Sequence, residues 1–437
     1  MRLKHVEYSG WGRTLRGASD IARPERQSAL EEAMRNIPAP VLGALRSYGD
    51  ACLNDSGKAI SSARLDRVLQ FDAETGQLTA EPGVRIGDLS ALLAPLGWLP
   101  PVMPGTGFAT VGGAAAMDVH GKNHHKAGSF GQHITALTLI TPKGVRKISP
   151  GASPELFRAT LGGLGQTGAI ASVEMQLLRC KGDVMMVTER RLRDWDEHIG
   201  LLDASDATYT VGWIDATATG AALGRGILEE AETGAGLVPP AKRGKRVPFD
   251  APGFALSGPV VKLFNAAYWR RVPARGRTVV KPINDFFFPL DKLYDWNRLY
   301  GRAGFHQFQC VVPLDQAAAL RNMLDTIAKS GLASPLAVLK RMGQGRAGYL
   351  SFPMEGYTLA VDFPNRRHAR RMVEGLTAAA RDAGGRIYFA KDSVATPELI
   401  AGMYPEQAKW AKTVQKVDPD RHLETDLTRR LQLRGIS

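Results

Sequence analysis

The sequence has few cysteines, no long apolar run and no signal-like N-terminus. Its three cysteines, Cys52, Cys180 and Cys310, are far apart and form no CxxC pair. This spacing excludes a zinc ribbon or a disulfide framework and predicts three reduced, partly buried side chains. No stretch approaches the roughly 18 apolar residues that cross a bilayer, and residues 1–9 lack the apolar core of a secretory signal. We therefore expect a cytoplasmic protein without a transmembrane segment.

Acidic residues are also scarce relative to basic ones. The chain has 43 acidic and 56 basic side chains, which gives a formal net charge of +13. Such an excess favours anionic partners: nucleic acid, an acidic membrane surface or a phosphorylated substrate. The basic runs at 241–246, 268–277 and 365–371 match no nucleic-acid-binding module, so we expect no nucleic-acid partner. We expect peripheral contact with lipid phosphates at the inner membrane, with solvated surface charge as the alternative.

The first 180 residues of this 437-residue chain mix short strand-like and helical segments. This mixing indicates an α+β fold and not a doubly wound parallel sheet. Helical periodicity is present at 29–37, 86–94 and 156–160, a hairpin is predicted over 67–80, and strands are predicted over 134–141 and 168–178.

The pattern changes after Cys180. Alternating apolar and polar residues at 209–215, 305–313 and 358–363 predict strands of a larger antiparallel sheet. Helical segments at 317–330 and 368–383 could cover one face of that sheet. The Gly-, Pro- and Lys/Arg-rich residues 234–292 predict a long loop, and 397–433 predict a helical C-terminus.

Glycine-bearing turns are concentrated within fewer than 30 residues. They occur at 104–107, 110–116, 118–125 and 128–131. A chain without Cβ atoms can place its backbone N–H groups against a pyrophosphate, so this density favours a cofactor loop over ordinary tight turns. The turns contain neither the G-x-G-x-x-G of a Rossmann fold nor the Gly-Lys-Ser/Thr of a Walker A loop, which disfavours the usual nicotinamide enzymes.

An earlier loop, residues 46–50, has the sequence R-S-Y-G-D. It is followed in order by P-G-T, T-V-G-G-A, H-G-K-N-H-H and G-S-F-G. This order resembles the FAD-binding (PCMH-type) domain of the vanillyl-alcohol-oxidase superfamily, and within it the decaprenylphosphoryl-ribose 2'-oxidases. The resemblance extends over nearly the whole chain through further short motifs at 10–13, 296–298, 307–309, 361–364, 390–393, 403–405 and 416–419.

The resemblance implies a two-domain fold. Residues 1–184 and 386–437 would form the FAD-binding domain, and 185–385 an inserted substrate domain built on an antiparallel sheet. The implied activity is FAD-dependent oxidation of the 2'-hydroxyl of a polyprenyl-phosphoryl ribose to the 2'-keto sugar. A partner keto-reductase would complete the epimerisation to arabinose. Many superfamily members tether FAD through a histidine in the first loop, where this chain has Tyr48, so we expect non-covalent FAD.

The resemblance also assigns site residues. Those expected to line FAD are Arg46, Ser47, Tyr48, Gly49, Asp50, Gly105, Thr106, Thr110, Val111, Gly112, Gly113, Met117, His120, Ile170 and Tyr388. Those expected to face the substrate are Lys122, Trp213, Gln307, Gln309, Lys340, Ala360 and Lys391. Well-known family members have cysteine at the position of Ala360, so the pocket wall differs here.

Oxidation of an alcohol requires a hydride acceptor, a base and a fixed positive charge. The reduced flavin carries negative charge near N1 and O2, which a neighbouring cation stabilises, and Lys391 is the candidate. The hydroxyl proton could pass to His120, Tyr48 or a lysine, and the sequence leaves this choice open. His124 and His125 are adjacent and point in different directions, so we expect hydrogen-bonded roles and no metal site.

Two other functions compete with this interpretation. A soluble aldonolactone or alditol oxidase of the same superfamily would reduce its flavin faster with free sugars and lactones than with lipid-linked ribose. A non-catalytic binding protein that retains the fold would remain colourless after incubation with FAD.

Overall fold

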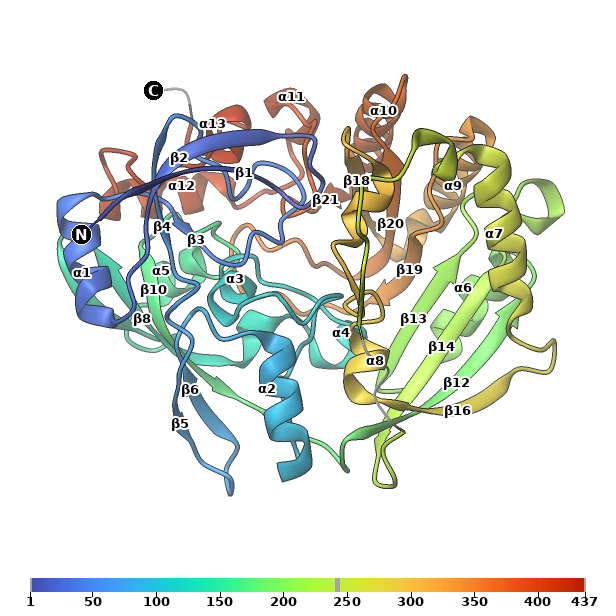
Figure 1. The fold of residues 1–437 in the computed structure, drawn as a ribbon, viewed down its shortest axis with the longest axis horizontal. Helices are drawn as coiled ribbons and strands as arrows, with labels where there is room; N and C mark the ends of the chain where they lie inside the picture. Colours follow the sequence, from blue (N-terminus) through green and yellow to red (C-terminus); the bar gives the residue numbers. More distant parts are fainter. Residues whose placement is uncertain (1, 240–243, 436–437) are drawn as a thin grey trace.

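The computed structural model describes residues 2–239 and 244–435 and contains two halves that lie side by side (Figure 1). One half contains the first 180 residues together with the C-terminal segment. The other half is built on a large sheet from the middle of the chain. Among the described residues, no helix is both long and apolar enough to cross a membrane.

The first half contains three small sheets. The four-stranded sheet has the order β1 (Lys4–Ser9), β2 (Arg16–Ala22), β4 (Gly57–Ser61) and β3 (Val41–Leu42), with parallel pairing between β2, β4 and β3. The antiparallel five-stranded sheet has the order β5 (Val68–Phe71), β6 (Gln77–Ala80), β10 (Ala169–Gln176), β8 (Ile134–Thr141) and β9 (Gly144–Ile148). A third sheet pairs β7 (Trp98–Leu99) with β11 (Leu178–Arg179).

Short helices surround these sheets. They are α1 (Gln27–Asn36), α2 (Ile86–Leu93), α3 (Val111–Ala116), α4 (His124–Ala127), α5 (Pro154–Thr160), α11 (Pro397–Ile400), α12 (Gln407–Val417) and α13 (Asp426–Arg430). The hairpin, the strands and the helices predicted for the first 180 residues are confirmed. The prediction of a helical C-terminus is only partly right, because turns at Gly402–Pro405 and Pro419 divide it into three helices.

The second half is an eight-stranded antiparallel sheet. Its order is β16 (Arg277–Pro282), β12 (Val184–Leu192), β14 (Gly226–Gly234), β13 (Tyr209–Ile214), β19 (Ala337–Met342), β20 (Gly356–Pro364), β18 (Phe305–Val312) and β21 (Arg386–Ile387). The predicted antiparallel sheet and the α+β class are confirmed. The division into residues 1–184 and 386–437 for the FAD-binding domain and 185–385 for the substrate domain stays a prediction, and β21, at its second boundary, pairs with β18.

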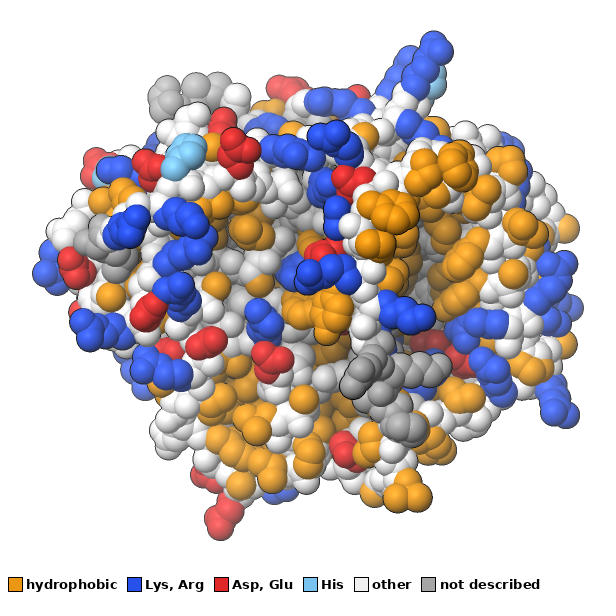
Figure 2. All heavy atoms as spheres, in the orientation of Figure 1, with side chains coloured by type: hydrophobic (Ala, Val, Ile, Leu, Met, Phe, Trp, Pro, Cys, Tyr) orange, Lys and Arg blue, Asp and Glu red, His pale blue; other side chains and the backbone are white. Residues whose placement is uncertain are grey.

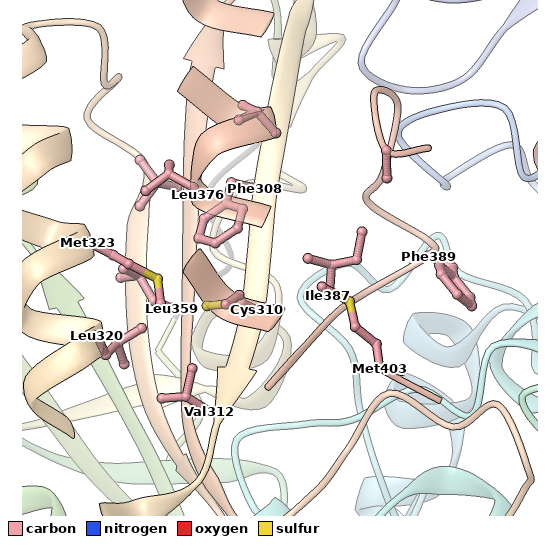
Figure 3. Close-up of a cluster of buried hydrophobic side chains, with 14 of the residues drawn as sticks. Phe308, Cys310, Val312, Leu320, Met323, Leu359, Leu376, Ile387, Phe389 and Met403 are labelled. Carbon is pink, nitrogen blue, oxygen red and sulfur yellow. The ribbon is translucent and has the colours of Figure 1, made fainter. Parts of the chain in front are cut away.

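One face of this sheet carries the main hydrophobic core. Helices α6 (Trp195–Ala204), α9 (Ala317–Ser330) and α10 (Ala369–Asp382) cover that face, and the last two were predicted. Figure 3 shows Phe308 and Cys310 of β18 among side chains from these layers, such as Leu320 and Leu376. Side chains alternate along a strand, so the neighbours of Phe308 and Cys310 must point to the opposite face.

The prediction of a long loop over 234–292 is wrong. This segment forms α7 (Gly258–Arg270), the edge strand β16 and α8 (Ile283–Phe287), and also contains β15 (Lys245–Arg246), which pairs with β17 (Leu293–Tyr294). Proline and glycine are common in loops, but Pro259 occupies the first turn of α7, where its missing N–H has no cost. Part of the basic run at 241–246, residues 241–243, lies outside the described residues.

Candidate flavin and substrate site

The face of the eight-stranded sheet opposite α6, α9 and α10 carries most of the predicted substrate residues. Gln307 of β18 is directly opposite Asp362 of β20, and Gln309 is opposite Ala360. The row of Ala360 continues through Val338 of β19 to Trp213 of β13. Lys340 lies on the next row of the same face, opposite Thr358. Strand alternation alone therefore brings Trp213, Gln307, Gln309, Lys340 and Ala360 onto one wall.

The first glycine-bearing loop presses against the turn that carries Lys391. Tyr48 N donates to Ala390 O at 2.8 Å. A Cβ on Gly49 would lie 1.8 Å from Asp392 O, so only glycine permits this approach. The neighbouring Asp50 is buried and forms an ion pair with Arg430 of α13. The carboxylate of Asp50 is therefore already bound within the protein. Only the backbone of Asp50 could make the predicted contact with the cofactor.

The second loop is fixed by caps and by a buried aspartate. The Thr110 hydroxyl accepts from Gly113 N at 3.3 Å and thus caps α3. Asp118, which is fully buried, accepts hydrogen bonds from Gly131 N at 2.8 Å and from Ala347 N at 3.0 Å. Burial raises the pKa of Asp118, and these donors oppose the shift. The loop backbone is therefore held in one conformation before any ligand binds.

His120 links the second loop to the sheet. Its Nε2 lies 2.9 Å from Nε2 of Gln309, and its ring packs beside Phe352 and Tyr388. Because the Gln309 amide nitrogen is a donor, Nε2 of His120 accepts and the ring proton is on Nδ1. That Nδ1 is buried without a hydrogen-bond partner in the described part of the chain. Burial, together with the charge of Lys340, lowers the pKa of His120 well below 6.5, so the ring is neutral.

Lys391 and Tyr48 meet between the two halves. The Lys391 Nζ lies 3.5 Å from the centroid of the Tyr48 ring. Burial lowers the pKa of Lys391, and the charge of Asp362 opposes this shift. Burial also raises the pKa of Tyr48 well above 10, so Tyr48 stays a phenol. The site thus combines bare loop backbone, a neutral imidazole donor, the lysine of the turn after β21 and the polar sheet face that carries Lys340.

Comparison with known proteins identifies the family. The sequence model of the FAD binding domain family matches residues 21–149 of this chain. The decaprenylphosphoryl-β-D-ribose oxidase of Mycolicibacterium smegmatis is 35% identical over 447 aligned residues, which cover 97% of each chain. The chain belongs to the decaprenylphosphoryl-β-D-ribose oxidase family. It is therefore an FAD-dependent oxidoreductase, as predicted.

More distant relatives share parts of this family's sequence or its fold. The L-gulonolactone oxidase of Bos taurus is 28% identical over 180 residues, or 40% of each chain. The structure of a xylooligosaccharide oxidase from Myceliophthora thermophila matches with a TM-score of 0.69, covering 96% of this chain and 92% of the other. At 14% identity, that match shows the fold alone.

The residues present fit the FAD of this family. His120 Nδ1 is a buried donor that needs an acceptor, and the flavin ring system carries acceptors along its polar edge. An ideal Cβ on Gly105 meets nothing within 4 Å, so this turn leaves open space beside the loop. Val111, Gly112 and Gly113 form the first turn of α3, Met117 follows that helix, and Ile170 lies on β10 next to it.

Several predicted site residues have their polar groups engaged within the protein. The Thr106 hydroxyl donates to Asp291 at 2.7 Å, and the Trp213 indole N–H donates to Pro335 O at 2.9 Å. Lys122 Nζ donates to Phe286 O and lies over the Phe286 ring. Arg46 stacks on Trp11 and Phe108. These side chains shape the site, and the roles of Thr106, Lys122, Trp213 and Arg46 toward cofactor and substrate stay predictions.

His124 and His125 have the hydrogen-bonded roles that were predicted. Nε2 of His124 lies 2.8 Å from Gly345 O, and Nε2 of His125 lies 2.9 Å from Ala207 O. Each ring therefore bonds to a different segment of backbone.

Sequence reasoning missed Asp362. This carboxyl is fully buried and accepts from Nε2 of Gln307 and from the Tyr300 hydroxyl at 3.1 Å. Burial raises its pKa, while Gln307 and the charge of Lys391 oppose the shift. The alternation of β20 could have revealed it, because Asp362 is two residues from Ala360 and must share its face.

Proposed function

We propose that the protein oxidises the 2'-hydroxyl of a polyprenyl-phosphoryl ribose to the 2'-keto sugar, using non-covalent FAD. The observation that carries this proposal is the 35% sequence identity with the decaprenylphosphoryl-β-D-ribose oxidase of M. smegmatis, which covers 97% of each chain. The polar sheet face of Gln307, Gln309 and Lys340, opposite the glycine-bearing loops, supports it. FAD, when bound, accepts two electrons and one hydrogen from the substrate carbon.

The loops would hold the cofactor without a covalent bond. The first loop, residues 46–50, offers backbone N–H groups and the phenol of Tyr48 in place of a histidine. The small residues at the start of α3 would let the cofactor approach the backbone closely, although the N–H groups of Val111, Gly112 and Gly113 already donate to Val84 O, Pro82 O and the Thr110 hydroxyl. His120 Nδ1 and the Tyr388 ring would contact the flavin. Release of intact FAD on acid denaturation would test the absence of a covalent bond.

The sheet face would orient the sugar. Lys340 and the second N–H of Gln307 would supply donors for sugar hydroxyls or a phosphate oxygen, while Gln309, whose amide nitrogen donates to His120 and Thr358, would offer its carbonyl oxygen as an acceptor. Ala360 leaves more space in the wall than a larger side chain would. Lys391 would lie beside the flavin, where its positive charge would stabilise the negative charge that the flavin gains on reduction.

The lipid chain would leave the site along α7. Trp213 on the sheet meets the Tyr268 ring of α7 edge-on at 4.7 Å, and Tyr268 stacks with Phe264 at 5.9 Å. Phe264 is 50% exposed and Leu263 is 74% exposed. This aromatic series is a continuous apolar path from the substrate wall to the surface.

The surface around α7 would contact an anionic membrane. Figure 2 shows apolar side chains gathered over this part of the molecule, with basic side chains around them. Phe249 and Phe254 are 66% and 73% exposed, and Lys245 and Arg246 are exposed nearby in the sequence. Apolar insertion combined with basic charge is the usual basis of reversible binding at a membrane surface. We propose a cytoplasmic protein that is peripheral at the inner membrane.

The product requires a second enzyme. A 2'-keto sugar has lost its stereocentre, so hydride addition to the opposite face gives the arabinose epimer. We propose that a partner keto-reductase performs this reduction.

The test is the product formed from competing substrates. The purified holoenzyme is given lipid-linked ribose or free aldonolactones and alditols, together with an electron acceptor, and products are analysed by mass spectrometry. We expect loss of two hydrogens from lipid-linked ribose and its conversion to lipid-linked arabinose when a keto-reductase is added. Faster oxidation of lactones or alditols would support the competing oxidase, a function to which the partial match with L-gulonolactone oxidase points.

A further inference from the structure

Asp362 is a buried carboxyl that faces a predicted substrate residue. It is fully buried on β20, directly opposite Gln307 of β18, so the two side chains project from the same face of the sheet. One carboxyl oxygen accepts from Nε2 of Gln307, and the other accepts from the Tyr300 hydroxyl at 3.1 Å. Such a carboxyl holds its donors firmly, because losing one would leave a buried oxygen without a partner.

The segment that follows α9 fixes the position of this carboxyl. Ser334 N donates to Asp362 O at 2.8 Å, and Asp362 N donates to Leu336 O at 3.1 Å. The Ser334 hydroxyl lies 2.8 Å from the hydroxyl of Tyr300, which is the second donor to the carboxyl. The acceptor that faces Gln307 is therefore held through both its backbone and its side chain.

The carboxyl also fixes the direction of the Gln307 amide. A carboxylate accepts hydrogen bonds and donates none, so Nε2 of Gln307 faces Asp362. The amide carbonyl oxygen and the second N–H are left for other partners. Because Gln307 is only half-buried, these two groups form the part of the network that a ligand can reach.

Gln307 lies next to the first glycine-bearing loop. Two residues before it, Phe305 N donates to Gly12 O at 2.8 Å, and Gly12 N donates to Tyr48 O at 2.9 Å. The Tyr48 ring meets the Phe305 ring edge-on at 5.4 Å. Burial raises the pKa of the Tyr48 hydroxyl, and a hydrogen bond with Gln307 opposes this shift. A sugar bound at the Gln307 amide therefore lies beside the loop that is expected to hold FAD.

We infer that Asp362 is a positioning residue that turns the Gln307 amide toward the 2',3'-cis-diol of the ribose. This inference rests on the proposed function and names the part of the sugar that Gln307 binds. One hydroxyl of the diol donates to the amide carbonyl oxygen, and its neighbour accepts from the second N–H. Two hydroxyls on the same side of a sugar ring match this acceptor and donor, whereas two on opposite sides do not.

The first test changes the substrate and leaves the protein unaltered. Wild-type holoenzyme receives lipid-linked ribose, the same compound without its 3'-hydroxyl, or its 3'-epimer, all of which keep the 2'-hydroxyl. The measurement is the second-order rate constant of anaerobic flavin reduction. We expect this constant to fall by about 10-fold for both analogues, which corresponds to roughly one lost hydrogen bond. An equal constant for ribose and either analogue would overturn the inference.

Two substitutions test whether the amide and the carboxyl act together. In Gln307→Leu, removal of the 3'-hydroxyl should cost less than about 2-fold, because its partner is already gone. Asp362→Asn should reduce the cost in the same way, because the new N–H lets the Gln307 amide turn and bind through its carbonyl oxygen. The full cost in either variant would contradict the inference.

Asp203→Asn is the matched control. Asp203 also accepts a tyrosine hydroxyl, that of Tyr357, but lies on α6 at the opposite face of the sheet. This variant should keep the full cost of removing the 3'-hydroxyl. Loss of discrimination in Asp203→Asn as well would show a general effect on the sheet and would overturn the role of Asp362.

The double variant separates positioning from a structural effect. If Asp362 acts through Gln307, adding Asp362→Asn to Gln307→Leu should leave the rate constant unchanged. A further decrease would show that Asp362 acts by another route. Where Asp362→Asn does not fold, Tyr300→Phe replaces it, because it removes the second donor that holds the carboxyl, and an undiminished cost there would contradict the network. Failure of lipid-linked ribose to reduce the wild type would instead refute the proposed function.

Discussion

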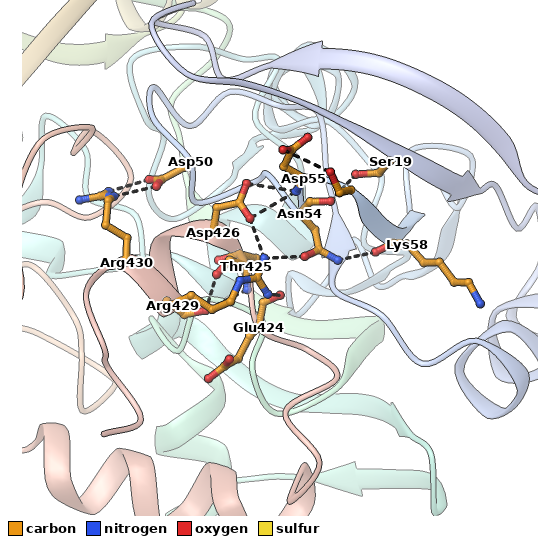
Figure 4. Close-up of polar contacts among 12 residues, drawn as sticks. Ser19, Asp50, Asn54, Asp55, Lys58, Glu424, Thr425, Asp426, Arg429 and Arg430 are labelled. Carbon is orange, nitrogen blue, oxygen red and sulfur yellow. Dashed lines mark hydrogen bonds and ion pairs between the residues drawn. The ribbon is translucent and has the colours of Figure 1, made fainter. Parts of the chain in front are cut away.

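Arg430 and Asp50 form a two-point ion pair that joins the last helix to the first glycine-bearing loop. The guanidinium donates to the two carboxylate oxygens at 2.8 and 2.6 Å, as Figure 4 shows. The same group reaches Asp392, next to Lys391, at 2.9 Å. One side chain from the C-terminus therefore fixes two loops that meet at the site.

Replacing Arg430 with methionine should destabilise the protein strongly. Asp50 and Asp392 are only 4% and 5% exposed, so both carboxylates would be left buried without their partner. We expect a loss of about 3–5 kcal/mol in the free energy of unfolding, measured by denaturant titration, and weaker FAD retention. The adjacent Arg429→Met is the control, because its pair with Asp426 is more exposed and should contribute less than about 1 kcal/mol. Equal losses of stability in the two variants would contradict this role of the Arg430 ion pairs with Asp50 and Asp392.

Gly49→Ala should abolish stable FAD binding. The new Cβ would lie 1.8 Å from Asp392 O, so the first loop or the Lys391 turn must move. FAD content after purification is the measurement. Gly375→Ala serves as the control, because its Cβ meets nothing within 4 Å in the middle of α10 and should stabilise the helix by up to about 1 kcal/mol. A Gly49→Ala protein with full FAD content would refute the close approach.

Lys340→Met should stabilise the protein at neutral pH and inactivate it. Burial lowers the pKa of Lys340 from 10.5 to about 8. The unfolded lysine therefore binds more protons than the folded one between these values, so its contribution to stability rises with pH across that window. Below pH 8 the full penalty applies, and its removal should raise the free energy of unfolding by roughly 1–3 kcal/mol.

The gain from Lys340→Met should shrink as pH rises from 8 to 10.5 and vanish above it. Denaturant titrations across this range provide the measurement. Exposed Lys412→Met should change stability by less than about 0.5 kcal/mol at every pH. A gain in the free energy of unfolding that grows with pH would contradict the predicted direction of the pH dependence.

Leu263→Glu in α7 should weaken binding to vesicles that contain anionic lipid. Leu263 is 74% exposed, and a carboxylate there opposes both apolar insertion and charge attraction. Leu92→Glu on α2 is the matched control, because Leu92 is also exposed, at 56%, but lies in the other half. Co-flotation with the vesicles should fall only for Leu263→Glu. Equal flotation of both variants would place the membrane contact elsewhere.

The alternating strands and the glycine-bearing loops could be predicted because each depends on local sequence. Period-2 patterns at 305–313 and 358–363 gave the strands that carry Gln309 and Ala360. Helix α7 was missed because Gly258 and Pro259 indicate a loop unless the chain after them is known to be packed. Its anchor is Asn265, whose amide donates to the distant Asp215 at 2.7 Å.

Long-range partners were beyond the sequence pattern. Arg430 is 380 residues from Asp50, and nothing local marks it as a partner of that loop. Asp362 was within a quoted motif, but its significance depends on the hydrogen bond from Gln307, which only the pairing of β18 with β20 brings opposite it. The hydrogen bonds of Thr106 to Asp291 and of Lys122 to Phe286 O could not be predicted either, because only the fold brings these groups together.

The most direct test is an anaerobic titration of the oxidised flavin absorbance. Lipid-linked ribose should bleach the flavin in one equivalent, whereas the same lipid carrying 2'-deoxyribose should leave the spectrum unchanged, because no 2'-hydroxyl is present to be oxidised. Bleaching by the deoxy compound, or by free lactones in preference to lipid-linked ribose, would contradict the proposed reaction.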